Sequence, residues 1–193
     1  MTYLAVNEFP EGSFTGTRAL TIQNYTEANV KSGRQFEAST FTNAFPGLAS
    51  SGYVILTGPD TVILKGRTIS VTGLGLKLEM FINPTFTGGI PQAIYTLNHR
   101  NSLGSNVTIL AAPTVTNDGT KVACDKYVLG SNLQGGRAVS SSTLFTEASG
   151  LEMVLPPHSI FYSKSTSLDK DPQSVFSYNT WYEGDTDLPI PPV

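Results

Sequence analysis

Two histidines, His99 and His158, are the first residues to consider for acid–base chemistry or metal binding. A zinc site needs three or four ligands at short, defined spacings such as Cys-x-x-Cys or His-x-x-x-His, and neither spacing occurs in this chain. A Ser-His-Asp triad can assemble from distant residues, but no Gly-x-Ser-x-Gly nucleophile elbow is present. We therefore expect both histidines to be surface or hydrogen-bonding residues.

Two pairs of aspartates are the next candidates for chemistry: Asp169 with Asp171, and Asp185 with Asp187. Glycoside hydrolysis needs two carboxyl groups that act from opposite sides of a sugar ring, and the members of each pair are too close in sequence for that. Such pairs could contribute oxygen ligands to calcium, although the full spacing of an EF-hand loop is absent. We predict no metal site, with calcium at these aspartates as the alternative.

Cys124 is the only cysteine, so the chain cannot form an internal disulfide. We expect Cys124 to be a small residue within a strand, because the two nearby lysines only weakly favour a reactive thiolate.

Gly73 and Gly75 lack the third glycine of a phosphate-binding loop and precede a strand. Asn24 and Asn106 match the glycosylation pattern by chance, since no secretory signal is recognisable. The sequence thus predicts a non-enzymatic protein without catalytic, cofactor-binding or metal-binding residues.

Composition excludes several classes of partner. The net charge is −3 and the basic residues are scattered singly, which argues against nucleic acid binding. No stretch approaches the roughly twenty apolar residues that a membrane-spanning helix needs. Charged residues make up 14% of the chain, against about a quarter in an average domain. Because Lys and Glu are depleted at protein–protein interfaces, this deficit favours a surface that partners cover.

The elements that would position any site are short strands separated by turn residues. Alternating or β-branched runs predict strands at Gly52–Thr57, Thr61–Lys65, Arg67–Thr72, Leu76–Ile82, Ala93–Leu97, Val107–Val115, Val122–Leu129, Glu152–Leu155, His158–Ser163 and Ser174–Tyr182. Turns are predicted at 117–119 and 135–136. Ser140–Ser149 is the only helix candidate and is equally plausible as a loop. This series predicts an all-β sandwich or jelly roll.

We divide the chain into three parts. Residues 1–50 are rich in isolated aromatics and turn residues, and predict either an extended N-terminal arm or edge strands of the same domain, since Arg18 to Gln23 alternates like a strand. Residues 51–183 form the sandwich, and 184–193 an acidic, proline-rich tail.

Trp181 could stack on a sugar, but a tryptophan among strand residues is more often part of a core. We therefore predict that Trp181 is packed inside.

The order of several segments from Arg34 onward resembles a group of tailed-bacteriophage virion structural proteins. The matching segments are 33–37, 62–69, 85–89, 95–98, 115–120 and 163–168, followed by the closing Trp-Tyr-Glu-Gly at 181–184 with Asp-Leu-Pro at 187–189. The resemblance implies a component of a virus particle with no catalytic residues.

From this resemblance and the arm–sandwich–tail layout we expect a capsid decoration, or cement, protein. It would bind the major capsid protein and neighbouring copies of itself, as a homotrimer that follows local capsid symmetry. It would lie on the capsid surface of the virion after synthesis in the host cytoplasm, with no small-molecule substrate. The alternative is a head- or tail-fibre-associated module that binds a host-surface glycan through loops 83–92 and 131–142. A position on the neck or tail stays open.

Overall fold

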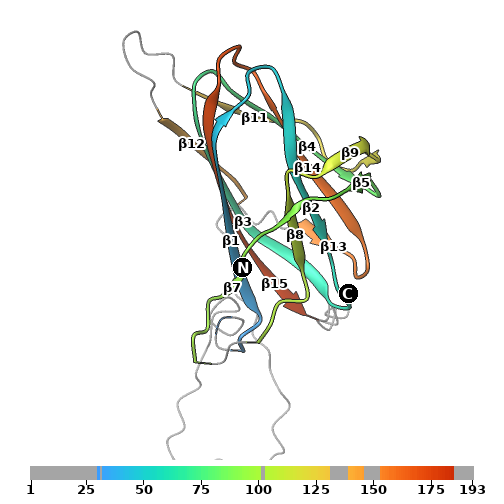
Figure 1. The fold of residues 1–193 in the computed structure, drawn as a ribbon. Coiled ribbons are helices and arrows are strands. Elements are labelled where there is room, and N and C mark those ends of the chain that lie inside the picture. The colour runs from blue at the N-terminus through green and yellow to red at the C-terminus, as the bar shows by residue number, and fades with distance from the viewer. Residues whose placement is uncertain (1–29, 31, 101–102, 131–138, 146–152, 185–193) are drawn as a thin grey trace, which may run out of the picture.

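The computed structural model describes residues 30, 32–100, 103–130, 139–145 and 153–184. Within them the secondary-structure elements are fifteen β-strands, and the strands that pair are antiparallel. The predicted all-β sandwich class is therefore confirmed (Figure 1).

Two sheets form the two layers of the sandwich, and a small third sheet lies on one of them. Sheet A has the order β12 (Val139–Phe145), β3 (Thr61–Thr72), β15 (Gln173–Gly184), β1 (Gln35–Phe45) and β7 (Tyr95–Thr96), with β13 (Met153–Leu155) also paired to β3. Sheet B has the order β10 (Thr120–Lys121), β4 (Gly75–Ile82), β14 (Ile160–Ser167), β2 (Ser50–Leu56), β8 (Thr108–Ala111) and β6 (Ile90–Pro91), with β11 (Lys126–Leu129) also paired to β4. Sheet C consists of β5 (Thr85–Thr87) and β9 (Thr114–Asn117).

The core lies between sheets A and B and follows the two-residue period of the strands. On β15, Val175, Ser177, Asn179 and Trp181 are buried at alternate positions. Trp181 is 1% exposed and stacks on Phe36 of β1 with ring centroids 6.1 Å apart. The prediction that Trp181 is packed inside is confirmed.

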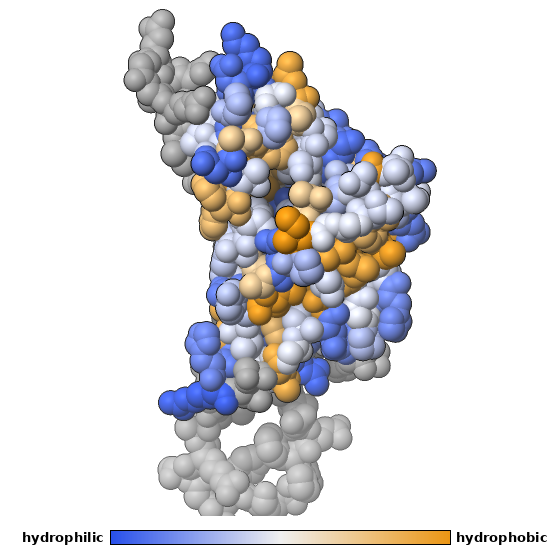
Figure 2. Space-filling model, in the orientation of Figure 1, coloured by the Kyte–Doolittle hydropathy of each residue, from blue (hydrophilic) through white to orange (hydrophobic). Residues whose placement is uncertain are grey.

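The outer faces of the two sheets differ. On sheet B, Val54, Phe81 and Tyr162 form an outer apolar cluster, and Phe86 and Val115 of sheet C pack against it. Sheet C thus covers part of sheet B, and Figure 2 shows apolar residues beside this two-stranded sheet. On the outer face of sheet A, no further sheet among the described residues covers Phe41 and Phe176 in this way, and both side chains are exposed.

Several predicted elements need correction. Within Ser140–Ser149, the helix-or-loop candidate, the described residues belong to β12, which pairs with β3 from Val139 to Phe145. Its serines and threonines carry no helical periodicity, and pairing with a neighbouring strand decides their conformation. The predicted break at Gly66 is not a gap between strands. Strand β3 runs through it with a bulge, because Leu64 and Gly66 oppose consecutive residues of β15.

Of two long predicted strands, one is divided and the other is shortened. Val107–Val115 contains β8 and the first two residues of β9, separated at Ala112, whose φ of 47° turns the chain before Pro113. Val122–Leu129 is reduced to β11, and Cys124 lies before that strand and is exposed, so its placement within a strand was wrong. The Arg18–Gln23 strand and the turn at 135–136 lie outside the described residues.

The segment 1–50 contributes β1 to sheet A. Strand β1 pairs with β15 from Gln35–Tyr182 to Phe45–Gln173. The sandwich thus includes residues 35–45. At the other end of the chain, β15 extends through Glu183 to Gly184, two residues beyond the predicted end of that strand at Tyr182.

Candidate interaction surface

The histidines considered for chemistry lie in exposed turns. His158 has a φ of 51° in the turn between β13 and β14, where its backbone N–H donates to the carbonyl of Gly58 at 2.9 Å. His99 follows β7. Among the described residues, no three His, Cys, Asp or Glu side chains are grouped as a metal site would require.

Asp169 organises the loop between β14 and β15. Its carboxylate accepts hydrogen bonds from the backbone N–H groups of Leu74 at 3.0 Å and Asp171 at 3.1 Å. These bonds connect the β14–β15 loop to the β3–β4 turn, so they account for an aspartate at this position by structure alone. Asp185 and Asp187 lie outside the described residues.

Backbone geometry explains why glycine occurs at positions 73 and 75. Their φ angles are 112° and 131°, in the region that favours glycine. A Cβ on Gly75 would lie 2.2 Å from the backbone oxygen of Val128. These glycines allow the tight β3–β4 turn and the close approach of β11.

Asn106, one of the two asparagines that match the glycosylation pattern, makes a hydrogen bond within the protein: its side-chain amide donates to Asp60 at 2.6 Å. Asn24 is outside the described residues.

Glu183 is a buried carboxylate that sequence reasoning missed. It is 3% exposed, yet it accepts hydrogen bonds from the indole of Trp181 at 2.8 Å, the backbone N–H of Asn106 at 2.7 Å, and the hydroxyl of Ser105. These donors connect the end of β15 to the loop before β8. The only sequence signal was the i, i+2 spacing of Trp181 and Glu183, which places both side chains on one face of a strand.

The core between the sheets has two apolar clusters, one that includes Phe36 and Trp181 and one that includes Ile69 and Leu76, and a polar belt lies between them. The guanidinium of Arg67 lies 5.2 Å from the centroid of the Tyr53 ring, and the Tyr53 hydroxyl donates to Asn179 at 3.3 Å. Lys126 belongs to the same region: burial lowers its pKa, Cys124 opposes that shift, and Arg67 adds to it. The belt joins sheet A to sheet B by contacts that require these particular side chains.

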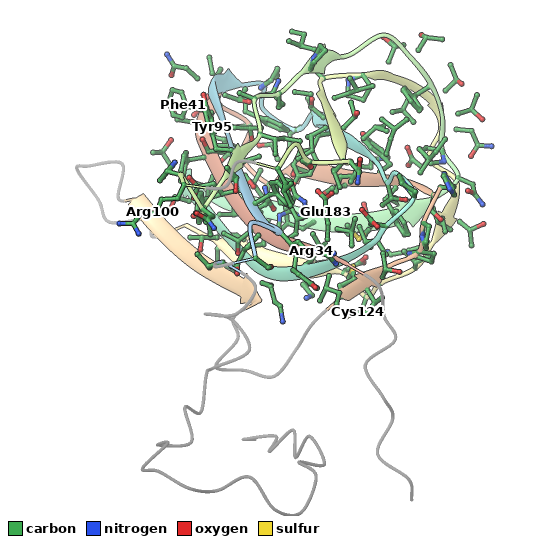
Figure 3. All side chains as sticks on the ribbon, turned by 90° about the horizontal axis from the view of Figure 1, so that it is seen from below. Arg34, Phe41, Tyr95, Arg100, Cys124 and Glu183 are labelled. Carbon is green, nitrogen blue, oxygen red and sulfur yellow. The ribbon has the colours of Figure 1, made fainter. Side chains whose placement is uncertain are left out.

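A row of side chains lies on the outer face of sheet A and is here named the aromatic stripe: Tyr95, Glu37, Tyr178, Phe176 and Phe41. Tyr95 opposes Glu37 across β7 and β1, and Phe41 opposes Phe176 across β1 and β15. Tyr178 lies two residues after Phe176, on the same face of β15. Phe41 is 65% exposed, Tyr95 61% and Phe176 39%. Figure 3 shows Phe41 and Tyr95 on one side of the molecule, with Cys124 far from both.

Glu37 is the one charged group of the stripe, and its carboxylate has a hydrogen-bond donor within the stripe, Tyr178. The Tyr178 hydroxyl donates to Glu37 at 2.5 Å. Partial burial, together with this bond and the nearby negative charge, raises the pKa of Tyr178 to about 12. Other outward residues around the stripe, Ser39 and Ser70, are small and uncharged.

The outer surface of sheet B has a different chemistry. There Glu79 accepts from Lys77 at 2.8 Å and from Lys121 at 2.9 Å, and Asp125 pairs with both lysines. Charged groups that bond to one another in this way suit a surface in contact with water. The aromatic stripe, with Glu37 as its one charged group, is by contrast the kind of surface found at the centre of protein interfaces.

An open strand edge borders the stripe. Beyond Glu37, on the side where β7 pairs, no described strand pairs with β1. Among the described residues, the backbone groups of β1 that point to this side from Ala38 to Asn43 thus have no strand partner, as at the edge of a sheet.

Comparison of the chain with models of known protein families found no match, and comparisons with curated proteins and with solved structures found none either. No helix of the described residues is both long and apolar enough to cross a membrane. Function is therefore inferred from the residues and their geometry.

Proposed function

We propose that this protein is a non-enzymatic structural protein of a tailed-bacteriophage virion, a decoration protein that binds the capsid surface and neighbouring copies of itself. The observation that supports the proposal is the aromatic stripe on the outer face of sheet A, which no other described sheet covers, next to the edge of β1. Exposed aromatic rows of this kind mark surfaces that other proteins cover. The order of segments that resembles virion proteins supports the choice of a virus particle as the assembly.

The stripe is suited to a large, flat partner. Phe41 and Phe176 oppose each other in the sheet, so a partner could bury both rings at one place. Buried aromatic side chains at interface centres contribute about 2 kcal/mol or more to binding, equal to roughly a thirtyfold change in affinity. The partner is the major capsid protein, and a homotrimer would present three such stripes to it.

A sedimentation assay with capsids assembled from the major capsid protein of the same phage tests the proposal. The Phe41→Ser/Phe176→Ser double variant is expected to bind capsids at least thirtyfold more weakly than the unchanged protein. The matched control is Ile90→Ser, which removes a 65% exposed side chain from β6 in sheet B and should leave binding unchanged. Equal binding by all three proteins would reject the stripe as the contact.

Two further measurements separate the parts of the proposal. Analytical ultracentrifugation of the purified protein tests the trimer. A glycan array tests the alternative function: specific glycan binding without any capsid binding would favour a host-surface module over a decoration protein.

A further inference from the structure

Glu37 lies between two tyrosines of the aromatic stripe. Tyr95 on β7 is its direct cross-strand neighbour on one side, and on the other side the Tyr178 hydroxyl of β15 donates to its Oε2. Side chains at opposed positions of an antiparallel pair lie beside one another on one face of the sheet. A carboxylate with an aromatic ring on each side attracts a cation, because the charge of the carboxylate and the faces of the rings are both negative.

No cation among the described residues balances the charge of Glu37. The ion pairs of the described residues lie on sheet B and in the turns beside it, and none of them includes Glu37. Thr180, which opposes Glu37 on β15, is uncharged. The described hydrogen bond to this carboxylate is the one that Tyr178 donates to Oε2, so in this part of the chain Oε1 has no donor.

The proposed capsid contact would cover this charge together with the aromatic rings. An ionised carboxylate that is removed from water without a partner is strongly unfavourable. At an interface, a cationic hydrogen-bond donor from the opposite surface offsets this cost. A surface that buries Phe41 and Phe176 therefore has to supply a donor to Glu37, and a cation supplies the donor and the opposite charge at once.

We propose that Glu37, Tyr95 and Tyr178 form a binding site for a cationic side chain of the capsid surface, an arginine. The inference rests on the proposed function, because it states what chemistry the partner presents to the stripe. A guanidinium donates to a carboxylate through its planar fork and also stacks on an aromatic face, whereas an ammonium is a compact, strongly hydrated charge. Arginine is also enriched in protein interfaces, where lysine is depleted.

The site also fixes the orientation of the partner. Glu37 and Phe41 are four residues apart on one strand, which corresponds to about 13 Å along the sheet. The matching capsid surface thus has an apolar patch for Phe41 and Phe176 and an arginine about 13 Å away from it. A partner turned end to end would place its apolar patch over the carboxylate, which is unfavourable.

Sedimentation with capsids assembled from the major capsid protein of the same phage tests the site. Glu37→Gln keeps the shape of the side chain and removes its charge, and it is expected to weaken binding at least about tenfold. The matched control is Glu79→Gln, the same change on the outer surface of sheet B, which should leave binding unchanged. Higher salt should weaken binding of the unchanged protein more than binding of Glu37→Gln, because salt screens the pair of charges.

Variants of Tyr95 test the aromatic part of the site. Tyr95→Phe keeps the ring and should bind capsids nearly as well as the unchanged protein. Tyr95→Ser removes the ring and should bind about fivefold more weakly. Equal binding by the two variants would remove Tyr95 from the site.

Three results would overturn the proposal. The first is capsid binding by Glu37→Gln as tight as that of the Glu79→Gln control. The second is a fall of more than about 5 °C in the Tm of free Glu37→Gln, which would assign the carboxylate to a contact within its own chain. The third is a changed sedimentation coefficient of free Glu37→Gln, which would assign it to a neighbouring copy.

Failure of this inference is distinct from failure of the proposed function. If the Phe41→Ser/Phe176→Ser variant loses capsid binding and Glu37→Gln retains it, the stripe is the contact and the arginine is not part of it. If the double variant binds capsids as the unchanged protein does, the stripe itself is rejected.

Discussion

At the scale of single residues, Glu183 shows how a charged side chain can hold a β-sandwich together. Its carboxylate is buried, and three donors from two parts of the chain point at it. Removing such an acceptor leaves buried donors unsatisfied, which costs more than the hydrogen bonds themselves contribute.

We expect Glu183→Ala to lower the free energy of unfolding by about 3 kcal/mol, because Trp181 and Asn106 lose their acceptor. Glu183→Gln keeps one acceptor oxygen and should lose clearly less. Urea denaturation followed by tryptophan fluorescence measures both. An alanine variant as stable as the unchanged protein would mean that the carboxylate is not needed there.

The Tyr178–Glu37 pair predicts a dependence on alkaline pH. The pKa of Tyr178 is raised in the folded protein to about 12, from an unfolded value of about 10. Its contribution to stability is thus fully present below pH 10 and is lost as the pH rises toward 12. Glu37→Gln should lower the pKa of Tyr178 only in part, because burial is the largest cause of the shift. Spectrophotometric titration against a Tyr178→Phe reference resolves this group, and an unchanged titration in Glu37→Gln would contradict the role of the carboxylate.

At the scale of elements, turn chemistry was well predicted from the sequence where the turn is local. The Asn-Asp-Gly turn between β9 and β10 forms as expected, with Gly119 at a φ of 90° and its N–H bonded to the Asn117 side chain at 2.9 Å. Strand ends were less well predicted, because they depend on partner strands. The bulge in β3 and the strand at Val139–Phe145 are both defined by pairing with residues far away in sequence.

Two glycines in left-handed conformations give a matched test. Gly75→Ala should destabilise the fold by about 3 kcal/mol or more, because its φ is 131° and the new Cβ would lie 2.2 Å from the Val128 carbonyl oxygen. Gly88→Ala, at a φ of 65° with nothing within 4 Å, should cost only about 1 kcal/mol of backbone strain. Thermal unfolding compares the two. Equal losses would show that the close approach of β11 adds nothing to the backbone term.

At the scale of the whole molecule, the outer sides of the two sheets differ in chemistry. Sheet C and a network of ion pairs occupy the outer side of sheet B, whereas the outer side of sheet A presents the aromatic stripe. A sandwich with one such face is suited to lie on a larger assembly, and its N-terminal segment enters the fold next to that face, at β1.

Truncation tests how much of the N-terminal segment belongs to the fold. Removal of residues 1–29 should leave a sandwich with nearly unchanged thermal stability. Removal of residues 1–45 should prevent folding, because it deletes β1 with Phe36, the stacking partner of Trp181. Near-ultraviolet circular dichroism measures both, and a folded 46–193 fragment would contradict this assignment.

The sequence by itself determined the class of the fold and the interior position of Trp181, because two-residue alternation and turn residues act over short distances. The tertiary structure alone decided which residues gather into sites. Glu183 became a buried anchor because the loop at 105–106 reaches it, and Phe41 joined Phe176 because β1 and β15 pair in one register. Such contacts join residues more than seventy positions apart, and no local pattern in the chain encodes them.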